Sequence, residues 1–292
     1  MPARQLGRTM APHFSERWLR DRLWFRWDRY KWRAQVRAES PGRANLRWAY
    51  ASLYAVKQDG SGRTRLTPDD SPQWSPSVCG DGRYIVYVAY REQKQGIWRM
   101  DADGSNPVRI ADETFAIGPQ CSPDGKWVVY VRGPSWAPVK VPITGGQPPE
   151  VLAQDFYVGL DSLLRISPDG KRIMYFASPE PSENPSPPSA KPRQPKVKVI
   201  PSDGGAELYK FDWPASASAP RWAPEGDAVE YALTRNGVSN LWQQKLTGGP
   251  PKQVTHFDSG EIFNFEWSRD GKQLALTRGS ESSDVILISN SR

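Results

Sequence analysis

The 292-residue chain is rich in tryptophan (13), proline (28) and glycine (24), and it carries a formal net charge of +7. Two cysteines and two histidines exclude a framework of disulfides and a histidine-rich metal site. No apolar run reaches the length of a membrane-spanning helix, and the start lacks the apolar core of a secretory signal.

The first 48 residues carry the whole charge excess. They contain eleven Arg, one Lys and four acidic residues, a net charge of +8, whereas residues 49–292 hold 27 basic and 28 acidic residues, a net charge of −1. Ser15 is suited to cap a helix that runs to about Ala38, with an apolar stripe at helical spacing. Such a basic helix would suit nucleic acid or an anionic membrane surface. The alternative is a poorly ordered Arg/Trp-rich extension, and in both cases residues 1–48 form a segment separate from the domain that follows.

A recurring glycine turn organises residues 49–292. The turns are Gly80-Asp81-Gly82, Pro123-Asp124-Gly125, Pro168-Asp169-Gly170, Pro224-Glu225-Gly226 and Arg269-Asp270-Gly271. Their last glycines are 43, 45, 56 and 45 residues apart. The long interval contains residues 178–197, whose seven Pro and four Ser are typical of a solvated loop inserted into one repeat.

Short β-rich runs surround each turn. The run after the turn is Tyr84–Tyr90, Trp127–Val131, Arg172–Ala177, Ala228–Leu233 and Gln273–Thr277. The next run is Ile97–Met100, Val139–Ile143, Val197–Ile200, Leu241–Leu246 and Val285–Ser289. A final short run closes most repeats, as at Val108–Ala111, and one more strand precedes each turn, as at Pro220–Ala223. Four strands in each repeat of about 40–45 residues predict an all-β protein, a β-propeller of four-stranded blades with five clear repeats and a partial one.

Several of these motifs match the pattern of a known family. The matching turns are Cys121–Gly125, Ile166–Gly170 and Trp267–Gly271. The matching dipeptides, each within a single predicted strand, are Ile97-Trp98 and Leu241-Trp242. They resemble the TolB-like, WD-repeat-like propellers, which are also similar to the propellers of dipeptidyl-peptidase-type enzymes. Residues 262–290 resemble the C-terminal propeller of bacterial Ser/Thr protein kinases and winged-helix regulators. The resemblance covers about residues 46–292, and no kinase or winged-helix domain is present in the chain.

The closure of the ring is left open by the sequence. Residues 53–58 and 63–67 look like the third and fourth strands of an earlier repeat, while the last repeat ends after its third strand at Ser289. Residues 63–67 are suited to complete the last blade, which would remove its free edge. Residues 53–58 would then duplicate the strand at Val285–Ser289, so either a sixth blade is incomplete or the chain is truncated from a larger propeller. Truncation is the interpretation we favour from the repeats.

No catalytic, cofactor-binding or metal-binding residue is predicted. The chain has no Gly-x-Ser-x-Gly nucleophile elbow, and the acids near His256 are too local to suggest a catalytic triad. A calcium array at the turn acids is disfavoured, because one acid on each separate turn does not bring several oxygens to one point. We therefore assign these acids to turn chemistry and do not predict an enzyme.

The two cysteines are expected to remain free. Cys79 and Cys121 lie one repeat apart but one position out of register, so strand alternation points their sulfur atoms to opposite faces. A disulfide is therefore not expected, and two free thiols would suit a reducing compartment. The default expectation for localisation is the cytoplasm, although the resemblance also allows an extracytoplasmic protein.

A polar set recurs on the strand that precedes each turn. Four residues before the turn acid stand Ser77, Gln120, Arg165, Arg221 and Glu266, each followed by an apolar residue. In propellers this innermost strand lines the central channel, so we expect the polar set to face the channel or its mouth. The alternative is that these side chains only hydrate a structural channel. We expect replacement of Arg165 and Arg221 by alanine to leave folding intact and to weaken partner binding.

The sequence therefore predicts a non-catalytic propeller that serves as a scaffold for binding another protein or peptide, or for sensing a ligand. One alternative is a regulatory propeller of a multidomain kinase or a prolyl-oligopeptidase-type peptidase whose catalytic domain is missing. A further alternative is binding of nucleic acid or an anionic membrane through residues 1–48.

Overall fold

The computed structural model describes residues 52–56, 61–67, 71–133, 135–156, 164–177, 195–268 and 270–280. The N-terminal segment 1–48, most of the Pro/Ser-rich loop and the predicted strand at 285–289 lie outside these residues. All regular elements of the described part are β-strands, which confirms the predicted all-β class. No helix in the described ranges has the length and apolar character needed to cross a membrane.

Four sheets have four antiparallel strands each, in chain order from one edge to the other. The first blade is β3 (Gln73–Val78), β4 (Tyr84–Arg91), β5 (Lys94–Asp101) and β6 (Val108–Glu113). The second is β7 (Phe115–Cys121), β8 (Trp127–Gly133), β9 (Ala137–Pro142) and β10 (Glu150–Val151). The third is β11 (Leu164–Ile166), β12 (Arg172–Ala177), β13 (Lys196–Pro201) and β14 (Tyr209–Asp212). The fourth is β15 (Ala217–Trp222), β16 (Ala228–Arg235), β17 (Val238–Lys245) and β18 (Lys252–Gln253).

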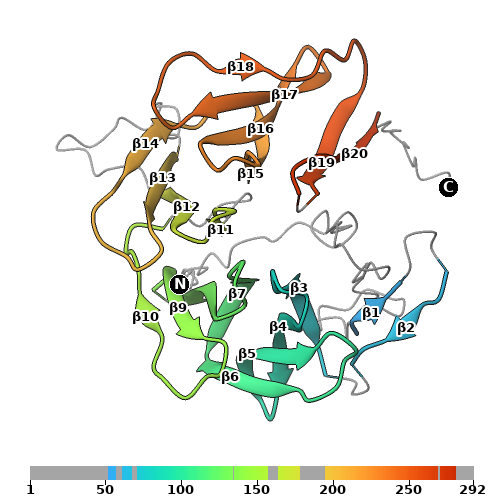
Figure 1. Cartoon of the computed structure of the whole chain (residues 1–292), viewed down its shortest axis with the longest axis vertical. Coiled ribbons are helices and arrows are strands. Elements are labelled where there is room, and N and C mark those ends of the chain that lie inside the picture. Colours follow the sequence, from blue (N-terminus) through green and yellow to red (C-terminus); the bar gives the residue numbers. More distant parts are fainter. Residues whose placement is uncertain are drawn as a thin grey trace, which may run out of the picture.

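Two further sheets have two strands each: β1 (Tyr54–Ala55) with β2 (Thr64–Arg65), and β19 (Glu261–Trp267) with β20 (Leu274–Gly279). The sheets are arranged around a common centre, with the first strand of each repeat (β3, β7, β11, β15 and β19) nearest to it (Figure 1). This is a β-propeller, as predicted from the repeats. The predicted strands that fall within the described residues agree with the observed ones to within a few residues.

The hairpin β1–β2 occupies the place of the third and fourth strands of a blade. Its Thr67 Oγ1 accepts the backbone N–H of Leu53 at 2.9 Å, and in the fourth blade Thr255 Oγ1 accepts that of Leu241 at the same distance. Leu53 and Leu66 are buried in one cluster with the first blade. The hairpin therefore packs beside the first blade as the outer half of the blade that precedes it, as expected for third and fourth strands.

Neighbouring blades contact each other through opposite faces of equivalent strands. Val86 and Val88 of β4 share a buried cluster with Val128 and Tyr130 of β8. The first two lie five and seven residues after their turn acid, whereas the other two lie four and six residues after theirs. Side chains alternate between the faces of a strand, so residues that meet across a junction stand at positions of opposite parity in their repeats.

The four turn aspartates accept backbone N–H groups of their own turns, as predicted for turn chemistry. Ser122 Oγ donates to Asp124 Oδ1 at 2.6 Å and accepts the backbone N–H groups of Lys126 and Trp127 at 3.0 and 3.1 Å. In the last turn Ser268 Oγ donates to Asp270 Oδ1 at 2.6 Å and accepts the backbone N–H of Gln273 at 2.9 Å, while Asp270 Oδ1 accepts that of Lys272 at 3.1 Å. The Ser-x-Asp pair therefore closes the hairpin between the first and second strands of a repeat.

Candidate functional site at the inner strands

The innermost strands carry a recurring β-bulge that sequence reasoning missed. The register shifts at Ser75-Pro76 in β3, Gly118-Pro119 in β7 and Ala219-Pro220 in β15. The first residue of each pair has a positive φ, of 51°, 59° and 52°. Proline has no backbone N–H for a strand ladder, so it is accommodated at a bulge. The signal was present in the sequence as a proline five residues before three of the turn acids.

The polar set stands at one level of the ring, next to these bulges. Its members pair with the residue five positions after the turn acid, namely Ser77 with Val86, Gln120 with Val129, Arg165 with Met174, Arg221 with Glu230 and Glu266 with Ala275. The common register confirms the alignment of the repeats. Val86, which stands at this paired position, contacts the following blade. Residues directly opposite each other in an antiparallel pair share one face of the sheet, so the polar side chains also lie on the face turned toward the following blade.

Burial divides this set into two groups. Ser77, Gln120 and Glu266 are half-buried, whereas Arg165 and Arg221 are only 8% and 5% exposed. The three half-buried side chains remain partly exposed to solvent. The two arginines are part of the packing between inner strands, so the expectation that their removal leaves folding intact does not fit their burial.

Arg221 connects the fourth blade to β19. Its Nε donates to Glu266 Oε2 at 2.9 Å, and its Nη2 donates to Asn264 Oδ1 at 2.7 Å. Its Nη1 donates to the carbonyl of Pro220, the proline of the bulge, at 2.9 Å. Two members of the predicted polar set are thus joined directly across one junction, and the bulge supplies a third acceptor.

A second polar contact crosses the same junction. Glu230 is buried, and its carboxylate accepts Trp267 Nε1 at 2.6 Å and Gln243 Nε2 at 3.0 Å. At the preceding junction, Trp222 Nε1 donates to the backbone carbonyl of Arg165 at 3.2 Å. The apolar residue that follows each polar one therefore faces the preceding blade, as expected from alternation along the strand.

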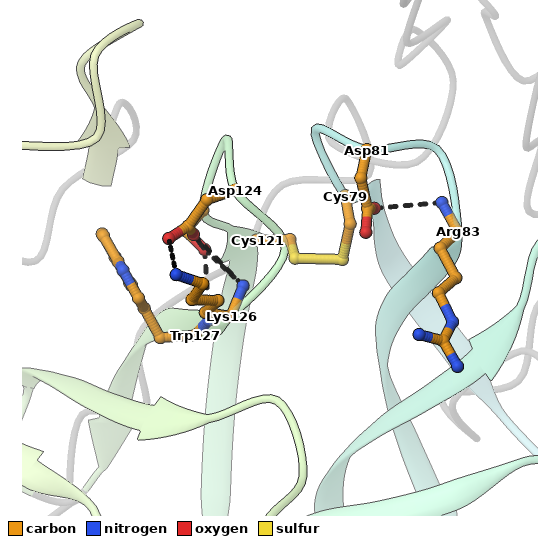
Figure 2. The surroundings of a disulfide bond; sticks show 8 residues. Cys79, Asp81, Arg83, Cys121, Asp124, Lys126 and Trp127 are labelled. Carbon is orange, nitrogen blue, oxygen red and sulfur yellow. Dashed lines mark hydrogen bonds and ion pairs between the residues drawn. A yellow bond between two sulfur atoms is a disulfide. The ribbon is translucent and has the colours of Figure 1, made fainter.

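The expectation for the cysteines was wrong. Cys79 and Cys121 form a disulfide between the inner strands of the first and second blades, with their Cα atoms 4.8 Å apart, and Figure 2 shows it between the two turns that carry Asp81 and Asp124. The one-position offset places the sulfur atoms on opposite faces of their repeats, and opposite faces are the ones that meet between neighbouring blades. Alternation along a strand separates two side chains only within one sheet, and these two cysteines belong to neighbouring sheets.

The described residues bring together no catalytic constellation. No group of three or more His, Cys, Asp or Glu side chains in these ranges is placed to hold a metal ion. His256 is exposed. The polar set of the inner strands presents a hydroxyl, an amide, a carboxylate and two guanidinium groups.

The carboxyl groups divide into two kinds by the direction of their pKa shift. Partial burial raises the pKa of Asp124 and Asp169, but hydrogen bonds from the turn serine and from a backbone N–H outweigh it and lower both below 3.8. The pKa of Asp270 is lowered by its hydrogen bonds with Ser268 and Lys272. Burial raises the pKa of Glu113 and Glu230 above 4.5, despite hydrogen bonds from Tyr130 and Trp267 respectively.

These opposite shifts predict a stability maximum in mild acid. The glutamates contribute stability that is fully present below pH 4.5 and is lost as pH rises through their raised pKa values. The turn aspartates contribute stability that is present above pH 3.8 and is lost as pH falls through their lowered pKa values. The melting temperature should therefore rise slightly on mild acidification and then fall. A profile that declines steadily from neutral pH, with no maximum, would contradict this assignment.

Curated proteins match parts of this chain in sequence, and solved structures match its fold. No family model matches the chain. The uncharacterized protein Atu1656 of Agrobacterium fabrum is 35% identical over 80 residues, which is 27% of each chain. Dipeptidyl-peptidase 5 of Porphyromonas endodontalis is 30% identical over 131 residues, which is 44% of this chain and 17% of that protein. The Tol-Pal system protein TolB of Francisella tularensis is 33% identical over 88 residues, 28% of this chain and 20% of its own length. The matches thus span no more than 27% of these relatives' length.

Solved structures show the same architecture at low sequence identity. TolB from Acinetobacter baumannii aligns with a TM-score of 0.52 at 16% identity, over 78% of this chain and 59% of that one. The propeller domain of the trilobed protease from Pyrococcus furiosus aligns with a TM-score of 0.56 at 15% identity, over 88% and 77% respectively. The chain is therefore a β-propeller similar to those of TolB and of propeller-bearing peptidases.

Proposed function

We propose that this chain is a non-catalytic propeller that binds another protein or a peptide where the polar set lines the inner strands. The observation that carries the proposal is the recurrence of polar side chains at one register level of five inner strands, beside bulges in three of them. Bulges re-aim side chains and are frequent at binding sites. The half-buried members, Ser77, Gln120 and Glu266, offer a hydroxyl, an amide and a carboxylate.

These groups suit an extended peptide. The amide of Gln120 both donates and accepts hydrogen bonds, and Glu266 accepts them, so each can pair with the N–H or C=O groups of a peptide backbone. The arginine of the Arg221–Glu266 pair holds the carboxylate in a defined position, which lowers the entropy cost of binding. The similarity to the Tol-Pal system protein TolB supports a protein partner, and it does not identify one.

A second candidate function is regulation of a peptidase. It is favoured by the matches to Dipeptidyl-peptidase 5 and, in structure, to the acylaminoacyl peptidase of Pyrococcus horikoshii, which aligns with a TM-score of 0.53. In that case the propeller would recognise a folded hydrolase domain rather than a free peptide. Binding through the basic segment 1–48 stays a prediction, because that segment lies outside the described residues.

The binding proposal predicts that Gln120→Arg weakens peptide binding about tenfold or more, a loss of about 1.4 kcal/mol. Arginine already occupies this register in the third and fourth repeats, as Arg165 and Arg221, so the fold accommodates it. The full chain would be used to select phage-displayed random peptides, and their affinities would be measured by fluorescence polarisation on the wild type and on the variant.

Lys252→Ala provides the matched control, because Lys252 is exposed on the outer strand β18. It should leave the affinity unchanged. Selected peptides that bind the wild type and Gln120→Arg equally would refute a site at the inner strands. Failure to select any peptide, combined with capture of a purified hydrolase domain of a propeller-bearing peptidase, would favour the second candidate function.

A further inference from the structure

The first turn of the propeller departs from the repeat at adjoining positions. Cys79 stands where three of the four later turns have a serine (Ser122, Ser167 and Ser268), and Gly80 stands where three of them have a proline (Pro123, Pro168 and Pro224). Its partner Cys121 occupies a position taken by Trp222 and Trp267 in the last two repeats. All of these departures meet at the junction between the first and second blades.

The proline that Gly80 replaces has a packing role at the other junctions. A Cβ atom on Gly170 would lie 3.3 Å from Pro123 Cδ, one on Gly226 would lie 3.5 Å from Pro168 Cδ, and one on Gly271 would lie 2.6 Å from Pro224 Cβ. At these three junctions the proline of one turn therefore packs against the glycine of the next turn. At the first junction the disulfide takes the place of this contact.

The first and second turns approach each other more closely than the turns at the other three junctions do. A Cβ atom on Gly80 would lie 2.1 Å from the carbonyl oxygen of Pro123, and the Gly80 N–H is directed to the carbonyl of Ser122 at 3.4 Å. Asp81 contributes a third contact, because its carboxylate lies 2.6 Å from the position of a Cβ on Gly125. Residues 79–81 therefore all contact the second turn.

A cysteine at position 79 is a poor substitute for the turn serine. Ser122 makes three hydrogen bonds that close its own turn, whereas a thiol is a weak donor and a weak acceptor. The gain from Cys79 lies instead in the covalent bond, which closes a loop across a sequence separation of 42 residues and removes conformations from the unfolded chain.

We propose that Cys79 and Cys121 form an oxidative maturation site, closed by thiol–disulfide exchange as the first two blades assemble, and that the chain matures in a compartment that supports disulfides. One cysteine thiolate attacks an oxidising protein disulfide, which forms a mixed disulfide and releases one thiolate of the oxidant. The second cysteine thiolate then attacks the mixed disulfide, which forms the Cys79–Cys121 bond and releases the other. The oxidant takes up two electrons, and the two cysteine protons go to the released thiolates.

Burial determines when this exchange takes place. Cys79 is 0% exposed and Cys121 is 4% exposed, and exchange requires access to the sulfur atom. The bond therefore forms before the blades are fully packed and is shielded from reductants afterwards. It also sets the spacing of Ser77 and Gln120, which lie two residues and one residue before the cysteines. The default expectation of a cytoplasmic protein is replaced by that of an oxidising compartment.

The test is to count free thiols by alkylation and mass spectrometry on the full chain. Chain produced in an oxidising compartment should take up no alkylating agent in denaturant, and two equivalents after reduction in denaturant. Dithiothreitol added to the native protein should leave the bond intact for much longer than it does in denaturant. Two free thiols in protein from the oxidising compartment, or equally fast reduction in both states, would overturn the proposal.

Stability provides the second measurement, independent of any binding partner. Cys79→Ser introduces the serine that three of the other turns carry and removes the bond, and it should lower the melting temperature by about 10 °C in the absence of reductant. Wild-type chain produced in a reducing compartment should melt near the variant and recover after unfolding and refolding with oxidised glutathione. Equal melting temperatures of the oxidised wild type and Cys79→Ser would refute a maturation role, whatever the peptide-binding result.

Discussion

Arg221→Ala should lower the free energy of unfolding by about 2–3 kcal/mol. Arg221 is 5% exposed, and its removal leaves Glu266 and Asn264 without the guanidinium that joins them to the fourth blade. Glu266 is one-third exposed, with a side-chain accessibility of 34%, so water compensates part of the loss and the effect stays below that of a fully buried pair. Urea denaturation monitored by tryptophan fluorescence would measure it.

Removing both partners should cost less than the sum of the single changes. When Arg221→Ala and Glu266→Ala are combined, the carboxylate that the arginine would have paired with is removed as well. A double-mutant cycle should therefore show a coupling energy of about 1–2 kcal/mol between the two residues. Lys252→Ala, on the exposed surface of β18, should change stability by about 0.5 kcal/mol or less. Strict additivity would show that the pair contributes nothing to holding β19.

Gly80→Ala should lower the free energy of unfolding by about 3 kcal/mol. The reason is the 2.1 Å separation between the added Cβ and the carbonyl oxygen of Pro123, which is a backbone atom held by the neighbouring turn. The disulfide prevents the two turns from moving apart, so the clash is relieved only by distortion of the backbone. Thermal or urea denaturation of the oxidised protein would measure the loss.

A control separates the clash from the ordinary cost of replacing a glycine. Gly146 has a φ of +80° and no atom within 4 Å of an added Cβ, so Gly146→Ala costs about 1–2 kcal/mol through backbone strain alone, whereas Gly80 has no positive φ and its larger penalty comes from the clash. In a Cys79→Ser background the turns are free to separate, and the penalty of Gly80→Ala should fall. An unchanged penalty in that background would show that the disulfide does not enforce the close approach.

The turn motif could be interpreted correctly from the sequence because its chemistry is local. Ser122, Asp124 and the backbone N–H groups of Lys126 and Trp127 lie within six residues of one another, so the motif itself specifies the hairpin. The strands next to the turns follow from the same signal, and β12 agrees with its predicted bounds at both ends. Recurrence of the motif at a near-constant period then specified the propeller.

The junctions between blades could not be predicted in this way. The partners Arg221 and Glu266 are 45 residues apart, and Cys79 and Cys121 are 42 apart. Alignment of the repeats showed which positions are equivalent, but not that neighbouring blades meet through opposite faces. The alignment placed the two cysteines one position out of register, which predicted free thiols. That offset is what brings the two sulfur atoms together, because neighbouring blades meet through opposite faces.

The candidate site shows both sides of this division. From the sequence alone, the polar residue four before each turn acid could be identified, together with its shared register. Only the tertiary structure decided that Arg165 and Arg221 are buried while Ser77, Gln120 and Glu266 stay accessible. The sequence by itself determined the repeat, the turns and the fold class, because these arise from interactions within about six residues. The tertiary structure decided which side chains meet between blades, because that depends on the faces that packing brings together.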